Sequence, residues 1–181
     1  MCKEGTSVDA LERLKAGNRL YLAEGKNALR ERTAKEGQHP YAIVVCCSDS
    51  RVIPERIFSV DIGDLFVIRV AGNVLDRHQL GSIEYAAEHL HCPLVLILGH
   101  TGCGAVAAAL SNHAEGLVAC ITEDIRKAIG METDPDAACR KNVLFGVKTV
   151  REAFCGTDLA VLGAVYDIAS GAVEWLYPPD L

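Results

Sequence analysis

The chain has 181 residues, of which 50% are hydrophobic and 23% are charged, with a formal net charge of −6 at pH 7. This length suits one globular domain with a proper core, and the composition excludes a disordered chain. The acidic balance without a basic stripe argues against nucleic acid as a partner. No apolar stretch approaches the ~20 residues of a membrane helix, and the first residues lack the apolar centre of a secretory signal. We therefore expect one domain over residues 1–181, located in the cytoplasm, with no membrane partner.

Apolar periodicity predicts helices and strands in alternation along the chain. A helix is expected from Ser7 toward Gly25, followed by a mostly irregular stretch over residues 26–39. Short apolar runs predict strands at residues 41–47, 65–70, 94–98 and 159–165, and a last strand near 172–177. Helices are expected at residues 80–90, 104–110 and 137–154, with short helical pieces between 113 and 136. This alternation predicts an α/β fold with a mostly parallel, right-handed sheet.

Two short motifs carry side chains that bind metal ions. Cys47-Ser48-Asp49-Ser50-Arg51 ends the first apolar run, and His100-Thr101-Gly102-Cys103 follows the third. Open α/β sheets bind their ligands at the carboxyl ends of strands, where both motifs fall. Two thiolates, one imidazole and one carboxylate are a ligand set that suits zinc. The sequence therefore predicts one zinc ion per chain, with three protein ligands and a fourth position that can open, as in a catalytic site.

The other cysteines of the chain have a simpler interpretation. Without a secretory signal, the eight cysteines do not indicate a disulfide framework. Cys46, Cys92, Cys120, Cys139 and Cys155 are expected to be small buried hydrophobic residues. Cys46 adjoins Cys47, but successive strand side chains point to opposite faces, so only one of the two can face the metal. The spacing to the carboxylate and arginine that follow selects Cys47.

Asp49 and Arg51 have predicted roles beside the metal. Two thiolates cancel the charge of Zn²⁺, so such a site lowers the pKa of bound water less than three histidines would. A nearby carboxylate that accepts a hydrogen bond from this water would help, and Asp49 lies two residues after the cysteine. Asp49 could instead occupy the fourth position, and Arg51 could hold it off the metal. An ordinary ion pair that stabilises a turn is the alternative.

With these motifs the chain resembles the β-class carbonic anhydrases. The resemblance covers nearly the whole chain, including Gly63 to Arg69, Ala71-Gly72-Asn73 and the segment from Val165 to Gly171. It implies a sheet of order 2-1-3-4 with a C-terminal edge strand, flanked by helices and preceded by an N-terminal helical arm. The implied zinc ligands are Cys47, His100 and Cys103, with Asp49 as gate or fourth ligand and Arg51 as its partner.

The resemblance also implies a substrate pocket. Gln38 matches the glutamine that hydrogen-bonds the substrate oxygen, and Gly104 matches the position whose backbone amide faces the substrate. Phe66 and Tyr85 match the aromatic residues that narrow the pocket, which the neighbouring subunit supplies in this family. Without the family pattern both aromatic residues would be assigned to the core. Val44 stands where another subgroup has tryptophan, so the chain resembles the plant-like subgroup, and a homodimer or higher even oligomer is expected.

The implied activity is the zinc-dependent, reversible hydration of CO₂ to bicarbonate and a proton by zinc-bound hydroxide, which is a carbonate dehydratase reaction on a small molecule. One alternative is the hydrolysis of carbonyl sulfide or carbon disulfide at the same site. Another is a non-catalytic zinc protein with Asp49 closed onto the metal. The presence of Asp49, Arg51 and Gln38 together argues against the latter, because a purely structural site needs none of them.

Overall fold

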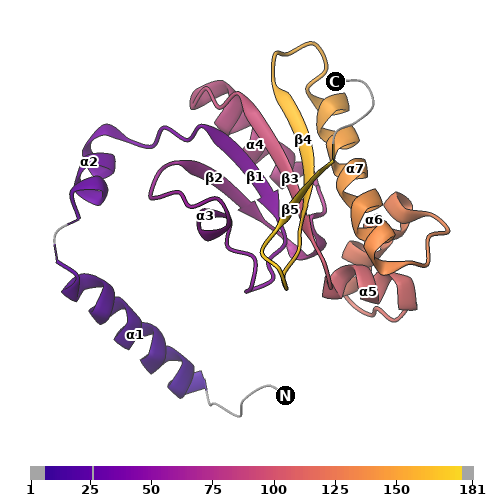
Figure 1. The fold of residues 1–181 in the computed structure, drawn as a ribbon, viewed down its shortest axis with the longest axis horizontal. Helices are drawn as coiled ribbons and strands as arrows, with labels where there is room; N and C mark the ends of the chain where they lie inside the picture. Colours follow the sequence, from indigo (N-terminus) through magenta and orange to yellow (C-terminus); the bar gives the residue numbers. More distant parts are fainter. Residues whose placement is uncertain (1–6, 26, 177–181) are drawn as a thin grey trace. The chain divides into compact units, whose positions relative to one another are not determined.

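The computed structural model describes residues 7–25 and 27–176, and a five-stranded sheet forms its centre. The strands are β1 (Ala42–Cys46), β2 (Leu65–Arg69), β3 (Leu94–His100), β4 (Ala160–Tyr166) and β5 (Val173–Leu176). They lie side by side in the order β2-β1-β3-β4-β5 (Figure 1). Strands β1 to β4 are parallel, and β5 pairs antiparallel with β4. The predicted strand order and edge strand are confirmed, although Tyr177, included in the predicted last strand, lies outside the described residues.

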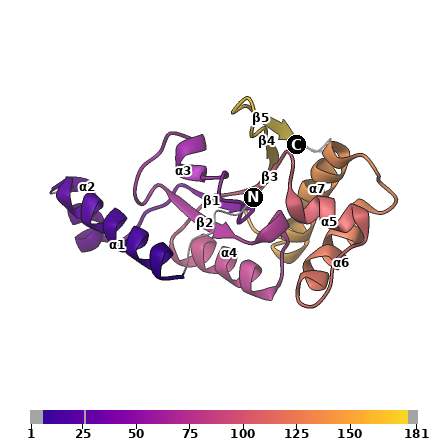
Figure 2. The ribbon, with the colours of Figure 1, turned by 90° about the horizontal axis from the view of Figure 1, so that it is seen from below.

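Helices cover both faces of this sheet. They are α3 (Pro54–Ile57), α4 (Arg77–His89), α5 (Gly104–Ser111), α6 (Val118–Ile129) and α7 (Pro135–Ala153), with a short 3₁₀ turn η1 (Ala71–Asn73) after β2. Figure 2 shows α3 and α4 on opposite sides of the strands. All five residues of β1 are buried, because a parallel strand in the middle of such a sheet has helices on both faces.

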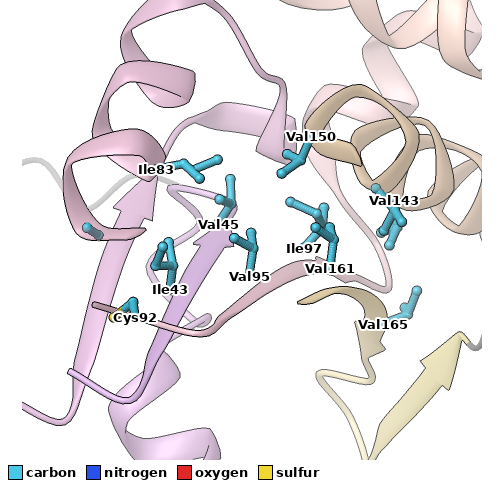
Figure 3. Close-up of a cluster of buried hydrophobic side chains, with 12 residues drawn as sticks. Ile43, Val45, Ile83, Cys92, Val95, Ile97, Val143, Val150, Val161 and Val165 are labelled. Carbon is cyan, nitrogen blue, oxygen red and sulfur yellow. The ribbon is translucent and has the colours of Figure 1, made fainter. Parts of the chain in front are cut away.

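The larger core cluster lies between the sheet and the helices α4 and α7. In Figure 3, Ile83 from α4 and Val143 from α7 point toward β1 and β3. Val143 lies against two glycines: a Cβ built on Gly99 would be 2.5 Å from its Cγ2, and one on Gly163 would be 2.8 Å from its Cγ1. Glycine at both strand positions therefore allows α7 to pack closely on β3 and β4.

Several local predictions need correction. The stretch 26–39, expected to be mostly irregular, contains the helix α2 (Ala28–Glu36). Asn27 is its N-cap residue, whose side chain accepts a hydrogen bond from the Arg30 amide, and Gly37 is its C-cap residue. The stretch from 113 to 136 contains one continuous helix, α6, rather than short pieces. The helix α3, with proline in its first turn, was not predicted. Short helices of this kind depend on their caps and on packing more than on apolar periodicity.

The cysteine prediction is correct for three of the five residues concerned. Cys46, Cys92 and Cys139 are buried, whereas Cys120 and Cys155 are exposed. Cys46 packs on the sheet face that carries Val52, away from the cluster that contains Cys47. The seven cysteines among the described residues are all free thiols.

The chain forms two compact units, residues 1–37 and residues 38–181. The first contains α1 (Ser7–Ala23), which confirms the predicted N-terminal helix, and α2. Helix α1 has no buried residue, and Leu14 and Leu20 on it are 73% and 71% exposed. Within residues 7–25 and 27–176, no helix is both long and apolar enough to cross a membrane.

Candidate metal centre

Three side chains that bind metals meet at the carboxyl ends of β1 and β3. Cys47 directly follows β1, His100 is the last residue of β3, and Cys103 is the N-cap residue of α5. Their ligand atoms all lie within 4.8 Å of one another, and all three residues are buried. β1 and β3 are neighbours at the point where the strand order reverses, which is where open α/β sheets bind their ligands.

The histidine offers a nitrogen that has no partner within the protein. Its Nδ1 lies 3.0 Å from the Thr101 carbonyl oxygen, which can only accept, so Nδ1 carries the hydrogen. The neutral ring then has a lone pair on Nε2. Nε2 is fully buried and has no hydrogen-bond partner among the described residues. A buried acceptor without a hydrogen-bond partner, beside two thiols, is the arrangement expected of a histidine that binds a metal ion.

The two thiols shift each other's pKa in opposite directions. A hydrogen bond from the Cys103 thiol lowers the pKa of Cys47, burial opposes this, and the hydrogen bond from the Gly72 amide lowers it further. The same pairing with Cys47, together with burial, raises the pKa of Cys103. The first thiolate therefore forms readily and the second does not without added positive charge. A divalent cation supplies that charge, so the donor set of two sulfurs and one imidazole nitrogen fits zinc.

Asp49 lies beside this group and is held by Arg51. Arg51 Nε donates to Asp49 Oδ1 at 2.9 Å, and Nη2 donates to Oδ2 at 2.7 Å, which makes a bidentate pair. The backbone amide of Arg51 also donates to Oδ1 at 3.0 Å. These contacts hold the pKa of the Asp49 carboxyl well below its usual range. Asp49 is thus an ionised carboxylate directed to the guanidinium, and it is not one of the three clustered ligand groups.

Arg69, the last residue of β2, supports the same turn and was not predicted as a site residue. Its Nη2 donates to the Asp49 carbonyl oxygen at 2.7 Å, and its Nε donates to the Cys47 carbonyl oxygen at 3.3 Å. In the sheet it is paired with Cys46. A charged residue at the end of an apolar strand was the available sequence signal, but only the strand pairing shows which turn it contacts.

The predicted pocket residues divide into two groups. Gly104 is the first residue of α5 and adjoins Cys103, one of the three clustered candidate ligands. Phe66 and Tyr85 pack on each other, with ring centroids 6.3 Å apart, but Phe66 pairs with Ile43 in the sheet. Cys47 follows β1 and lies roughly 13 Å from Ile43, at about 3.3 Å per residue along the strand. The aromatic pair therefore lies toward the amino ends of the strands, away from the ligands of its own chain.

Gln38 belongs to the same distant group. It precedes β1, whose first residue is Ala42, and its side chain is exposed. Because β1 runs toward Cys47, Gln38 and Cys47 lie at opposite ends of this strand. One chain thus brings together the ligand set, the Asp49–Arg51 pair and Gly104, but not Gln38 or the two aromatic residues.

The fold and the site together define an α/β protein with a cluster of two cysteines and one histidine that could hold a metal ion at the switch point of its sheet. The sequence model described as carbonic anhydrase matches residues 42–173. A carbonic anhydrase of Mycolicibacterium smegmatis is 37% identical over 183 aligned positions, which cover 92% of this chain and 88% of that protein.

Solved structures give the same result. The β-carbonic anhydrase CafA of Aspergillus fumigatus superposes with a TM-score of 0.80 at 30% identity, covering 95% of this chain and 94% of that one. A β-carbonic anhydrase of Sordaria macrospora, described as tetrameric, superposes with a TM-score of 0.72 at 27% identity, covering 93% and 95%. The chain belongs to the carbonic anhydrase family, in its β class, as the sequence motifs predicted.

Proposed function

We propose that this protein is a carbonate dehydratase that catalyses the zinc-dependent, reversible hydration of CO₂ to bicarbonate and a proton. The observation that carries the proposal is the buried group of Cys47, His100 and Cys103 beside a carboxylate held by Arg51. A zinc ion bound by the three ligands would have one position free for water and would lower the pKa of that water. Family membership supports the same reaction.

The side chains around the centre suit the handling of a small, linear substrate. Arg51 occupies one side of the Asp49 carboxylate and keeps it ionised, so the remaining lone pairs of Asp49 can accept a hydrogen bond from a water molecule and orient it. Gly104, at the start of α5, has a backbone amide without a partner inside the helix, which suits a substrate oxygen. Asp49 therefore acts as acceptor and Gly104 as donor in this proposal.

We infer that the active unit is at least a homodimer. Gln38, Phe66 and Tyr85 lie away from the ligands of their own chain, so a second copy must supply them if they line the pocket. The exposed apolar side chains of α1 offer a surface for such a copy, and the Sordaria macrospora relative is described as tetrameric. Sedimentation of the active protein tests this, and a fully active monomer would contradict it. We propose that residues 1–181 form a single carbonic anhydrase-like domain made of the two compact units described above. The cytoplasmic location stays a prediction.

The proposed reaction is tested by stopped-flow CO₂ hydration with the purified zinc form. Cys103→Ala should lose both zinc and activity, because it removes a ligand. Cys155→Ala makes the same chemical change at an exposed cysteine and serves as the matched control, which should retain both. A wild type with one zinc per chain and no CO₂ hydration would refute the proposal.

Two alternatives are outcomes of the same test. If the same zinc form hydrolyses carbonyl sulfide or carbon disulfide in place of hydrating CO₂, the proposed substrate changes but the proposed active site does not. The non-catalytic alternative requires Asp49 on the metal. The bidentate contact between Asp49 and Arg51 favours the catalytic proposal over that one, because it occupies the carboxylate elsewhere.

A further inference from the structure

The turn η1 contacts the metal centre through its backbone. The amide of Gly72 donates to Cys47 Sγ at 3.3 Å, and both groups are buried. Gly72 has φ of 66°, and a Cβ at this position would lie 2.7 Å from Ile125 Cδ1 and 3.0 Å from Ala105 Cβ. Only glycine fits between α5 and α6 in this conformation. The amide of Gly72 reaches Cys47 Sγ because position 72 carries no side chain that would push η1 away from α5 and α6.

A side chain from α7 holds the other side of the same residue. Asn142 Nδ2 donates to the Gly72 carbonyl oxygen at 2.8 Å, although the two residues are 70 positions apart. Asn142 is only 5% exposed. Asparagine is a weak helix former, and burying an amide costs free energy unless it is hydrogen-bonded. This contact with Gly72 therefore gives a physical reason for a polar residue on a buried face of α7.

The same face of α7 also reaches the second half of the centre. Cys139 lies one helical turn before Asn142, and its thiol donates to the His100 carbonyl oxygen at 3.3 Å. One turn of α7 thus contacts the backbone next to Cys47 and the backbone of the ligand His100. Helix α7 can therefore fix the position of Gly72, whose amide donates to Cys47, and the position of His100 at the end of β3.

We propose that Asn142 is a positioning residue of the metal centre, which fixes Gly72 so that its amide donates to the Cys47 sulfur. The proposal rests on the metal centre described above and concerns how its sulfur ligand is tuned. A hydrogen bond to a thiolate withdraws electron density from the sulfur, so the sulfur donates less charge to the metal. In a site with two thiolates, this would partly restore the acidity that a second sulfur removes.

Cobalt(II) substitution tests the proposal directly, because the energy of the sulfur-to-cobalt charge-transfer band depends on the electron density of the thiolates. Asn142→Leu keeps a similar volume but removes the donor. Asn142→Ala also removes the donor, introduces no charge and replaces asparagine with a good helix former. In both variants we expect the band to move to lower energy. Because Gly72 then no longer holds Cys47 in position, we also expect zinc affinity to fall by about 10- to 100-fold, the usual effect of removing a group that orients a ligand.

Val150→Ala provides the control for general loosening of α7. Val150 is fully buried on the same helix and packs in the core cluster, not against η1. This variant should keep the wild-type band energy and zinc affinity even though it is less stable. If Asn142→Leu does not fold, Asn142→Ala carries the comparison, with the same expected shift.

The outcomes distinguish this inference from the proposed function. The wild-type cobalt spectrum reports whether the metal centre exists, and CO₂ hydration reports the reaction. The difference between the Asn142 variants and the wild type reports the role of Asn142. A wild-type band energy and zinc affinity in both variants, or an equal shift in Val150→Ala, would overturn the inference while leaving the proposed function intact.

Discussion

The close packing of α7 on the sheet makes a quantitative prediction at Gly99. Gly99→Ala would place a Cβ 2.5 Å from Val143 Cγ2, too close for the native packing. Overpacking of this kind in a well-packed core typically costs about 1–3 kcal/mol of the free energy of unfolding. Val143 is fully buried. Val143→Ala removes two methyl groups, and at about 0.8 kcal/mol per buried group this costs roughly 2 kcal/mol before any cavity contribution.

The double variant separates steric conflict from other causes. When Val143→Ala removes the methyl that the new Cβ would strike, the Cβ at position 99 enters the space that this methyl leaves. We therefore expect the double variant to lose about 1–2 kcal/mol less than the sum of the single variants, within the usual range for residues in contact.

Urea unfolding of the four proteins measures this coupling. The measurements use one protein concentration and one zinc concentration, because association and metal binding both change apparent stability. Val150→Ala combined with Gly99→Ala is the control pair, since Val150 is not among the atoms near the added Cβ. Additive losses for Gly99 and Val143 would refute the packing argument.

Three further predictions concern the metal centre and the surface. The wild type should contain about one zinc per chain by elemental analysis, and His100→Ala should lose it, since a two-cysteine remnant is a poor site; full occupancy in the variant would exclude His100 as a ligand. Arg51→Ala should keep zinc but lower CO₂ turnover at least tenfold, because Asp49 loses its bidentate partner and is free to move onto the metal; undiminished turnover in stopped-flow assays would refute the gate role. Lys141, together with the backbone amides of Asp134 and Thr133, lowers the pKa of Glu132 from 4.5 to about 2, so these contacts stabilise the folded state above pH 4.5, and their contribution is lost as pH falls toward 2. Lys141→Met should therefore lower Tm slightly at pH 7 and by less at pH 3; a difference that grows in acid would contradict this.

Local patterns in the sequence were sufficient to predict the main elements and the three side chains that cluster at the candidate metal site. The apolar runs that became β1 and β3 are short and bounded, and a buried parallel strand leaves such a run because both its faces are covered. Cys47 directly follows β1, His100 ends β3 and Cys103 comes three residues later, so strand direction carries all three to the carboxyl edge of the sheet. The resemblance to β-class carbonic anhydrases added the strand order, which the structure confirms.

The tertiary structure decided which distant residues support this centre and which residues stay apart from it. Asn142 contacts Gly72 only because α7 packs on β3 and β4, and Arg69 contacts Asp49 only because β2 pairs with β1. No local periodicity encodes contacts across 70 or 20 positions. Phe66 matches a pocket residue by sequence, yet its register places it near the start of β1, far from the ligands of its own chain. Sequence determines the chemistry that a local motif can perform, whereas the packing of separate elements determines which backbone and side-chain groups surround it.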